Sequence, residues 1–148
     1  MKKFVFCSAL ALLSGLSQAE STLPYCTAGQ VIQLSVTLDS ARQAHFAYQQ
    51  NGVLCDGNVE LSQNGLITYD LLATNQSPQG LRFVGAGFTN PFDGHIDLVT
   101  VSGDGQRIEL QNNINQLGVS KFQFIFASDE TDLLLVSPDP QILNKGDE

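Results

Sequence analysis

The chain has 148 residues, 43% of them hydrophobic, and its 15 acidic and 7 basic side chains give a formal charge of −8 at pH 7. This length suits one domain around a single core and is too short for two such domains. The acidic balance argues against nucleic acid and anionic membranes as partners, because both carry negative charge.

The first 19 residues have the pattern of a secretory signal peptide. Lys2 and Lys3 precede an apolar run from Phe4 to Leu16, and Ser17-Gln18-Ala19 has the small-x-small form of a cleavage site. The alternative is a buried N-terminal helix, which would need neither the basic start nor the cleavage sequence. We therefore predict that residues 1–19 are removed before Glu20 and that the mature protein is periplasmic or secreted.

Removal of the signal changes the charge and the cysteine count. Two of the seven basic residues leave, so five Lys or Arg remain against fifteen Asp or Glu, a formal charge of −10. Cys7 also leaves, and the remaining Cys26 and Cys55 predict one disulfide in an oxidising compartment. The alternatives are two free thiols, or a metal pair completed by His45 and His95, although the spacing fits no zinc pattern.

Residues 20–148 are expected to form a single all-β domain, a two-sheet antiparallel β-sandwich of jelly-roll or immunoglobulin-like type. Helical periodicity is nowhere sustained across three turns, and short alternating runs are separated by Asn-Gly and Asp-Gly pairs, which tolerate positive φ. Asp104-Gly105 marks the clearest hairpin. The nine predicted strands are Val31 to Leu38, His45 to Gln50, Asn58 to Ser62, Leu66 to Leu72, Leu81 to Val84, Ile96 to Ser102, Arg107 to Gln111, Lys121 to Ala127 and Leu133 to Val136.

A segment from Phe83 to Gly94 combines three glycines with three phenylalanines. The glycines predict a bulged strand and the phenylalanines a packed loop over one end of the core. The functional alternative is that the segment presents Thr89 or Asp93 to a site. Its Gly-x-Gly lacks the third glycine and the helix of a dinucleotide-binding loop.

The stretch KFQFIFASDETDLLLVSPDP runs from Lys121 to Pro140. The two-residue period of strands predicts a hairpin in which Lys121 lies opposite Asp139. The other pairs of this register are Ala127 with Leu133, Ile125 with Leu135, and Gln123 with Ser137. One face of the hairpin would then carry the apolar side chains Phe122, Phe124, Phe126, Leu134, Val136 and Pro138.

The Asp139-Pro140 bond is chemically weaker than its neighbours. The aspartyl carboxyl can attack its own main-chain carbonyl through a five-membered ring, and well-oriented groups of this kind reach effective molarities of about 10⁵ M or more. Water would capture the resulting anhydride as an acid, and the Lys121 amine would capture it as an amide. The bland alternative is that Lys121 and Asp139 form a solvated ion pair, worth about 0 to 1 kcal/mol.

A second carboxylate would serve as a general base or proton shuttle. The candidates are Asp93, in the glycine-rich segment, and Asp97, which alternates with Val99 and Val101 on a predicted buried face. A buried aspartate needs partners, so Asp97 is alternatively a hydrogen-bonded structural carboxylate.

Two stretches resemble the DP-EP family, small bacterial β-sandwich proteins that behave as self-cleaving endopeptidases. They are GLRFVGAGFTNPFDGHIDLVTVSGDGQ, from Gly80 to Gln106, and KFQFIFASDETDLLLVSPDPQI, from Lys121 to Ile142. The resemblance implies cleavage between Asp139 and Pro140, with residues 140–148 remaining docked. It also implies an aspartate-activated water and, as one outcome, a covalent link from Lys121 to Asp139. The signal sequence and the cysteine pair are not part of the family pattern.

The leading expectation is therefore an aspartic-type endopeptidase that acts once, on its own chain, with no cofactor or metal. Its partner would be its own C-terminal segment. The alternative is a secreted, non-enzymatic binding or assembly sandwich, which would self-assemble through exposed strand edges. The absence of Trp argues against a sugar-binding platform. A metal-dependent hydrolase is the third hypothesis, but His45 and His95, expected to be surface or capping residues, lack ligand spacing.

Overall fold

The computed structural model describes residues 22–146, so the predicted signal peptide and the cleavage point before Glu20 lie outside the described part of the chain. Within that part there are eleven strands and no helix long and apolar enough to cross a membrane. The strands are β1 (Ile32–Leu38), β2 (Ala44–Gln50), β3 (Val53–Cys55), β4 (Val59–Leu61), β5 (Gly65–Leu71), β6 (Arg82–Phe88), β7 (Ile96–Val101), β8 (Arg107–Asn112), β9 (Gly118–Ala127), β10 (Leu135–Val136) and β11 (Gln141–Asn144).

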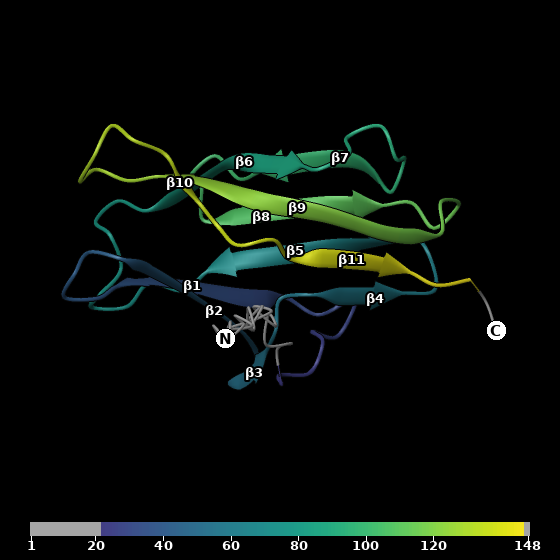
Figure 1. Ribbon diagram of the computed structural model, residues 1–148, viewed down its shortest axis with the longest axis horizontal. Coiled ribbons are helices and arrows are strands. Elements are labelled where there is room, and N and C mark those ends of the chain that lie inside the picture. Colours follow the sequence, from purple (N-terminus) through teal and green to yellow (C-terminus); the bar gives the residue numbers. More distant parts are fainter. Residues whose placement is uncertain (1–21, 147–148) are drawn as a thin grey trace, which may run out of the picture.

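Two sheets form a β-sandwich, which confirms the predicted fold class (Figure 1). One sheet has the order β3-β2-β1-β5-β8-β7. In the other, β6 pairs with one edge of β9, whereas β10 and β11 pair with its opposite edge and β4 follows β11. Two pairs, β1 with β5 and β4 with β11, are parallel. The sheets are therefore mixed, whereas purely antiparallel sheets were predicted. The sequence did not indicate β3 and β11 as separate strands.

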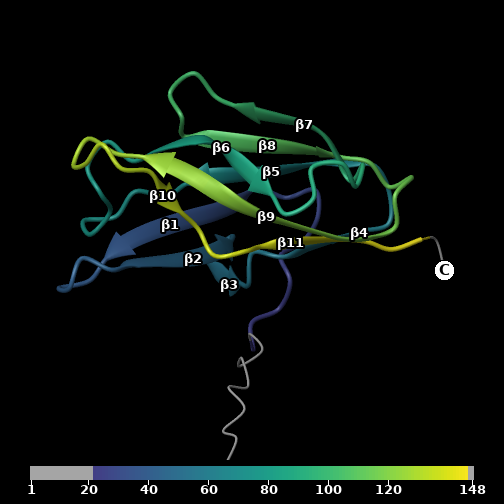
Figure 2. The same ribbon diagram turned by 45° about the horizontal axis from the view of Figure 1, so that its top comes forward.

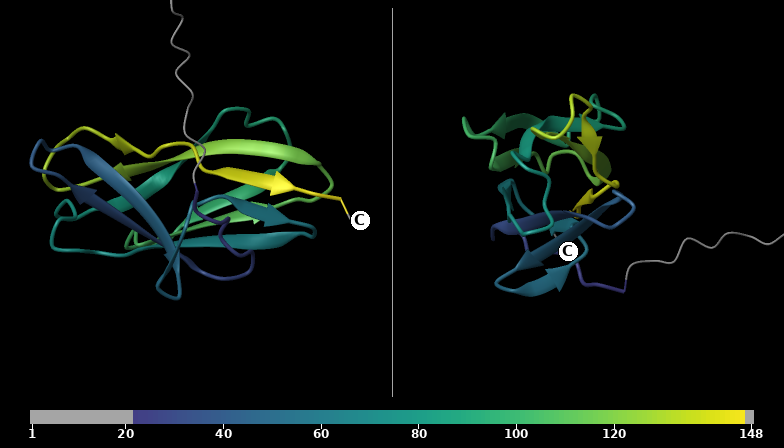
Figure 3. Two further views of the ribbon diagram at one scale, coloured as in Figure 1. Left: turned by 60° about the horizontal axis from the view of Figure 1, so that its bottom comes forward. Right: turned by 90° about the vertical axis from the view of Figure 1, so that its left-hand side faces the viewer.

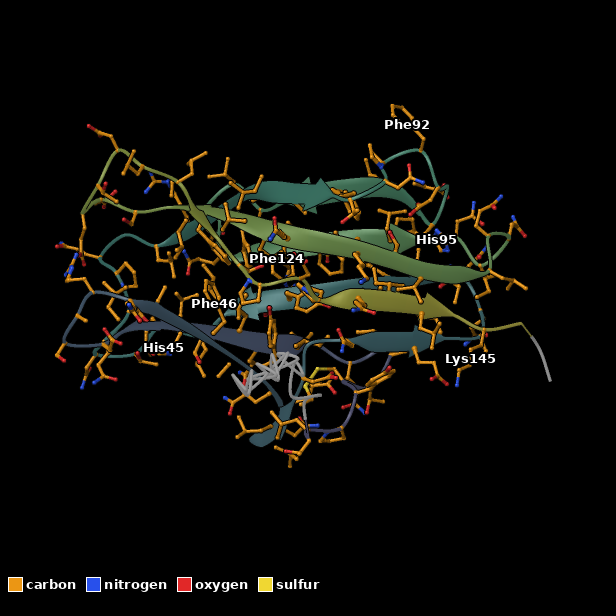
Figure 4. The ribbon with its side chains drawn as sticks, in the orientation of Figure 1. His45, Phe46, Phe92, His95, Phe124 and Lys145 are labelled. Carbon is orange, nitrogen blue, oxygen red and sulfur yellow. A yellow bond between two sulfur atoms is a disulfide. The ribbon has the colours of Figure 1, made fainter. Side chains whose placement is uncertain are left out.

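The core is built on the alternation of β9. Phe122, Phe124 and Phe126 all point inward and are almost completely buried, as predicted. The Tyr69 ring of β5 meets the Phe124 ring edge to face, with centroids 4.7 Å apart, which joins the two sheets. Phe46 of β2 packs against the same core beside Phe126 (Figure 4).

The predicted disulfide between Cys26 and Cys55 is present, and both cysteines are buried. Cys26 also forms an isolated parallel bridge with Val59, the first residue of β4. The disulfide therefore ties the N-terminal segment to the end of β3, and the bridge places that segment alongside the start of the short strand β4.

Two of the predicted turns and the bulge predicted in the glycine-rich segment are confirmed. Asp104-Gly105 connects β7 to β8, with Gly105 at φ +70°, and the glycine-rich strand β6 carries a bulge between Phe83 and Gly85. Asn51 and Gly52, both at positive φ, connect β2 to β3, as expected for an Asn-Gly hairpin turn.

The predicted register of the β9–β10 hairpin is wrong by one residue. Leu135 lies opposite Phe126 and Val136 opposite Ile125, so Leu134 and Val136 are 58% and 45% exposed. Ser137 is buried in place of the apolar side chains that were predicted to face inward. Its burial is possible because its Oγ accepts a hydrogen bond from the Phe124 N–H at 2.8 Å. The prediction followed the apolar alternation and the pairing of Lys121 with Asp139, and it gave the Ser137 hydroxyl no role.

Candidate functional site

The Asp139-Pro140 bond lies between two strands that follow one another along the same edge of β9 (Figure 2). Before the bond, the Ser137 N–H donates to the Phe124 carbonyl at 3.0 Å. After it, the Phe122 N–H donates to the Pro140 carbonyl at 3.2 Å. Pro138 and Asp139 therefore lie opposite the single residue Gln123, which is a β-bulge. Bulges re-aim side chains and occur next to active sites.

The two residues of the bond have opposite environments. Asp139 is exposed, and neither its main chain nor its carboxyl makes a hydrogen bond within residues 22–146. Pro140 is buried and lies on the inner face of the sheet with Ile142. The bulge thus leaves the carboxyl free to rotate toward its own carbonyl carbon while the proline ring is held in the core.

Lys121 lies directly opposite Gln141, and not opposite Asp139 as predicted. The register differs by two residues: one comes from the register of the β9–β10 hairpin, and the other comes from the bulge, which adds one residue to the C-terminal strand. Lys121 is exposed on the outer face of β9 and makes no ion pair among the described residues. Asp139 is its diagonal neighbour, and diagonal neighbours across two strands are about 7–8 Å apart, a distance that a lysine side chain can span.

The outer face of β9 is open on the side of β6. Gly87 lies opposite Gln123 and Gly85 opposite Ile125, so neither of these two β6 positions has a side chain, and Val84, the extra residue of the β6 bulge, is exposed. A Cβ atom at Gly85 would meet nothing within 4 Å. Solvent therefore reaches the outer face of β9 beside the bond.

Asp93 approaches β9 from the inner face. Its Oδ1 accepts the His95 N–H and lies 3.0 Å from His95 Nδ1, while its Oδ2 accepts the Ser120 hydroxyl at 3.1 Å. Burial raises the pKa of Asp93, but the hydrogen bonds from His95 and Ser120 together outweigh it and hold the pKa below its usual value. Ser120 immediately precedes Lys121, so Asp93 is anchored one residue from the predicted amine, on the opposite face of the strand.

The prediction that His95 is a surface or capping residue is wrong, because His95 is 6% exposed (Figure 4). Sequence reasoning also missed Ser120 as the partner of Asp93. The signal was present, since Ser120 continues the inward alternation of Phe122 and Phe124, and a buried hydroxyl requires a hydrogen-bond partner.

Asp97 is not on a buried face, contrary to prediction. A bulge between Ile96 and Leu98 turns its side chain outward, where both carboxylate oxygens accept from Asn113 Nδ2 at 3.2 and 3.3 Å. Asp93 and Asp97 line one shallow depression of about 100 Å³. Among the described residues neither of them contacts Asp139.

The disulfide overturns the alternative in which Cys26 and Cys55 bind a metal with the two histidines. His45 lies on the surface, with Nε2 2.9 Å from Asp39 Oδ2. No group of three or more His, Cys, Asp or Glu side chains within residues 22–146 is arranged to hold a metal ion.

Comparison with known proteins gives one family. The model of the DP-EP family matches residues 30–146, which include the glycine-rich segment, the bulge at Pro138 and Asp139, and the Asp139-Pro140 bond. No curated protein matches the chain.

Proposed function

The chain belongs to the DP-EP family, and from this membership and the geometry of the Asp139-Pro140 bond we propose that it is a self-cleaving, aspartic-type endopeptidase that cuts this bond in its own chain. The observation that carries the proposal is the bulge. It combines an exposed carboxyl that has no hydrogen bond among the described residues with a buried proline at the next position.

In the proposed reaction an Asp139 carboxylate oxygen attacks the Asp139 carbonyl carbon. The bond to the Pro140 nitrogen breaks, and this nitrogen takes up a proton and becomes the new N-terminus of the released segment. A five-membered cyclic anhydride remains at Asp139. Because nucleophile and carbonyl belong to one residue, the large effective molarity of intramolecular reactions applies.

Two nucleophiles can open the anhydride. Water gives a free C-terminal aspartate, so that one water is consumed overall. The neutral Lys121 amine instead gives an amide to Asp139 and loses a proton, so that no water is consumed. Lys121 and Asp139 lie on the same solvent-exposed face, which supports this second outcome.

Of the two candidate bases, Asp93 is better suited than Asp97 to the alternative route, in which an aspartate activates a water that attacks the Asp139 carbonyl. Its lowered pKa keeps it ionised at neutral pH, the state that a base requires. Its bond to Ser120 anchors it to β9, three residues before Gln123, the residue that faces the bulge. Asp97 is instead bound by Asn113 and faces away from the core.

The proposed site of action is the periplasm or the exterior of the cell. The disulfide between Cys26 and Cys55 supports this location, since such bonds persist in oxidising compartments. Residues 140–146 would stay docked after cleavage, because β11 pairs with β9 on one side and with β4 on the other.

The test is the intact mass of the purified mature protein, denatured at neutral pH so that acid does not break the bond. We expect two species, residues 20–139 and residues 140–148. In molecules where Lys121 has captured Asp139, the mass of the larger species should be lower by one water. Asp139→Asn should remain a single chain, whereas Asp132→Asn, an exposed aspartate in the β9–β10 loop, should be cut as usual. One species at the full mature mass would instead favour the non-enzymatic binding sandwich.

Lys121→Arg separates the two outcomes. Arginine keeps the positive charge but its guanidinium is not a nucleophile at neutral pH, because it stays protonated. The variant should be cut, with the larger fragment always at the mass of the free acid. A fragment one water lighter in this variant would show that another group captures Asp139.

A further inference from the structure

The C-terminal strand β11 is a central strand of its sheet, although it lies at the end of the chain. Figure 3 (left) shows this yellow strand alongside the light green β9. Four residues pair antiparallel with β9, from Gln141 opposite Lys121 to Asn144 opposite Gly118. Three residues also pair in parallel with β4. Without β11, the facing edges of β9 and β4 would both lack a partner, and unpaired strand edges are sites for strand addition.

Side chains of this segment fill the interior at alternate positions. Ile142 is fully buried and Asn144 is 2% exposed. Asn144 Nδ2 donates to the Asn113 carbonyl at 3.0 Å and to the Gln116 carbonyl at 2.9 Å. The space between β9 and β4 therefore has an apolar position and, two residues further, a polar position that an amide satisfies.

Contacts at both ends of β11 fix its position along the groove. The Gln141 N–H donates to Asn58 Oδ1 at 2.8 Å at one end. At the other end Lys145 Nζ lies 2.8 Å from Glu60 Oε2, and the Lys145 N–H donates to the Leu61 carbonyl at 2.9 Å. A slip of one residue would exchange Ile142 and Asn144 for Leu143 and Lys145 at the buried positions, so only one register fits.

We propose that the space between β9 and β4 is a strand-accepting groove in which the C-terminal segment of a second copy of this chain replaces the protein's own segment once the Asp139-Pro140 bond is cut. This inference rests on the proposed function, since an intact bond ties β11 to β10 through only four residues. After the cut, the segment is held by non-covalent contacts alone. Those contacts are identical for the protein's own segment and for that of another copy, so exchange follows mass action.

The chemistry of the groove defines what it accepts. It takes an extended peptide with a branched apolar residue at the position of Ile142 and a side-chain amide at that of Asn144. A basic residue follows, facing Glu60. Within residues 140–148 the sequence PQILNKGDE meets all three requirements.

The test uses cut mature protein and a synthetic PQILNKGDE peptide with isotopically heavy leucine, added in molar excess. Native mass spectrometry measures how much heavy peptide enters the complex. We expect the heavy fraction of the bound peptide to become equal to the heavy fraction of all peptide in the sample. A peptide with Ile142→Asp should bind at least about 100-fold more weakly, because it would bury a charge. A peptide with Gln141→Glu, changed on the outer face, should exchange normally.

A second protein version separates this inference from the proposed cleavage. It carries Asp139→Asn and a recognition sequence for a site-specific protease inserted after the exposed Pro138, and it is cut only after folding. Exchange of the peptide in this version supports the strand-accepting groove even when the natural chain is found uncut. An uncut natural chain would overturn the proposed function and leave the groove standing. The inference is overturned if the cut protein of both versions binds no heavy peptide after long incubation and keeps only its own segment.

Discussion

β10 and β11 lie end to end along one edge of β9, yet only β11 belongs to the core. β10 has two residues and pairs with β9 alone; its Val136 and the preceding Leu134 have exposed side chains. β11 has four residues, pairs on both sides, and buries Ile142 completely. The bulge at Pro138 and Asp139 separates the two strands. A cut there would divide a surface strand from a core strand, so the fold can tolerate the break.

The largest expected contrast comes from truncating one buried and one exposed side chain of these strands. Ile142→Ala should lower the free energy of unfolding by about 2–5 kcal/mol, because it leaves a cavity in the core. Val136→Ala, at a position 45% exposed, should cost about 0.5 kcal/mol or less. Urea unfolding followed by circular dichroism measures both, in an Asp139→Asn background that keeps the chain in one piece. Equal losses would contradict the contrast between the strands.

Local sequence signals predicted much of the region that surrounds β9. Alternation alone identified Phe122, Phe124 and Phe126 as inward side chains, and the Asp-Gly pair before Gln106 identified a hairpin. These features depend on residues close in sequence, where the strand period and the freedom of glycine decide the outcome. The weakness of the Asp139-Pro140 bond is also local chemistry.

Features that depend on distant segments were not predictable in this way. The register of β9 and β10 depends on the loop between them, which is held by ion pairs of Arg42 with Glu130 and of Arg82 with Asp129. The place of β11 depends on β4, some eighty residues earlier in the chain; the bond from Gln141 to Asn58, for example, spans 83 residues. The bulge that turns Asp97 outward likewise follows from pairing with β8.

The next prediction concerns β4, which pairs with β11 on the side opposite β9, whereas β10 has no such second partner. β4, the second partner of β11, has only three residues, and the disulfide lies next to it. Replacing Cys26 and Cys55 by serine should lower the free energy of unfolding by about 2–4 kcal/mol, chiefly because the unfolded chain gains freedom. Reduction of the parent protein should reproduce this loss and leave the variant unchanged. In cut protein, loss of the disulfide should also speed release of residues 140–148, which native mass spectrometry would detect.

A smaller effect is expected from the buried amide of β11. Asn144→Ala removes two hydrogen bonds to carbonyl oxygens, each worth about 0.5–1.5 kcal/mol net. In the parent protein the buried Asn144 Oδ1 accepts no hydrogen bond among the described residues, and the cost of burying it offsets part of the stabilisation that the two hydrogen bonds provide. The net loss should therefore be about 1–2 kcal/mol by urea unfolding. Asn115→Ala, an exposed position in the neighbouring loop, should have no measurable effect; an equal loss there would assign the effect to the loop.

The smallest effect concerns Asp93, which supports the half of β9 that pairs with β11. Asp93→Asn should cost about 1 kcal/mol at pH 7, since a charged acceptor makes stronger hydrogen bonds than a neutral one. The pKa of Asp93 is lowered from 3.8 in the folded protein, so its contribution is present above about pH 4 and is lost as the pH falls through the folded-state pKa. The difference between parent and variant should therefore shrink toward pH 3, measured in the Asp139→Asn background because acid breaks Asp-Pro bonds. Asp97→Asn, exposed on the other sheet, should show a smaller difference at pH 7; a larger one would mean that Asp97, and not Asp93, is the carboxylate on which this part of the fold depends.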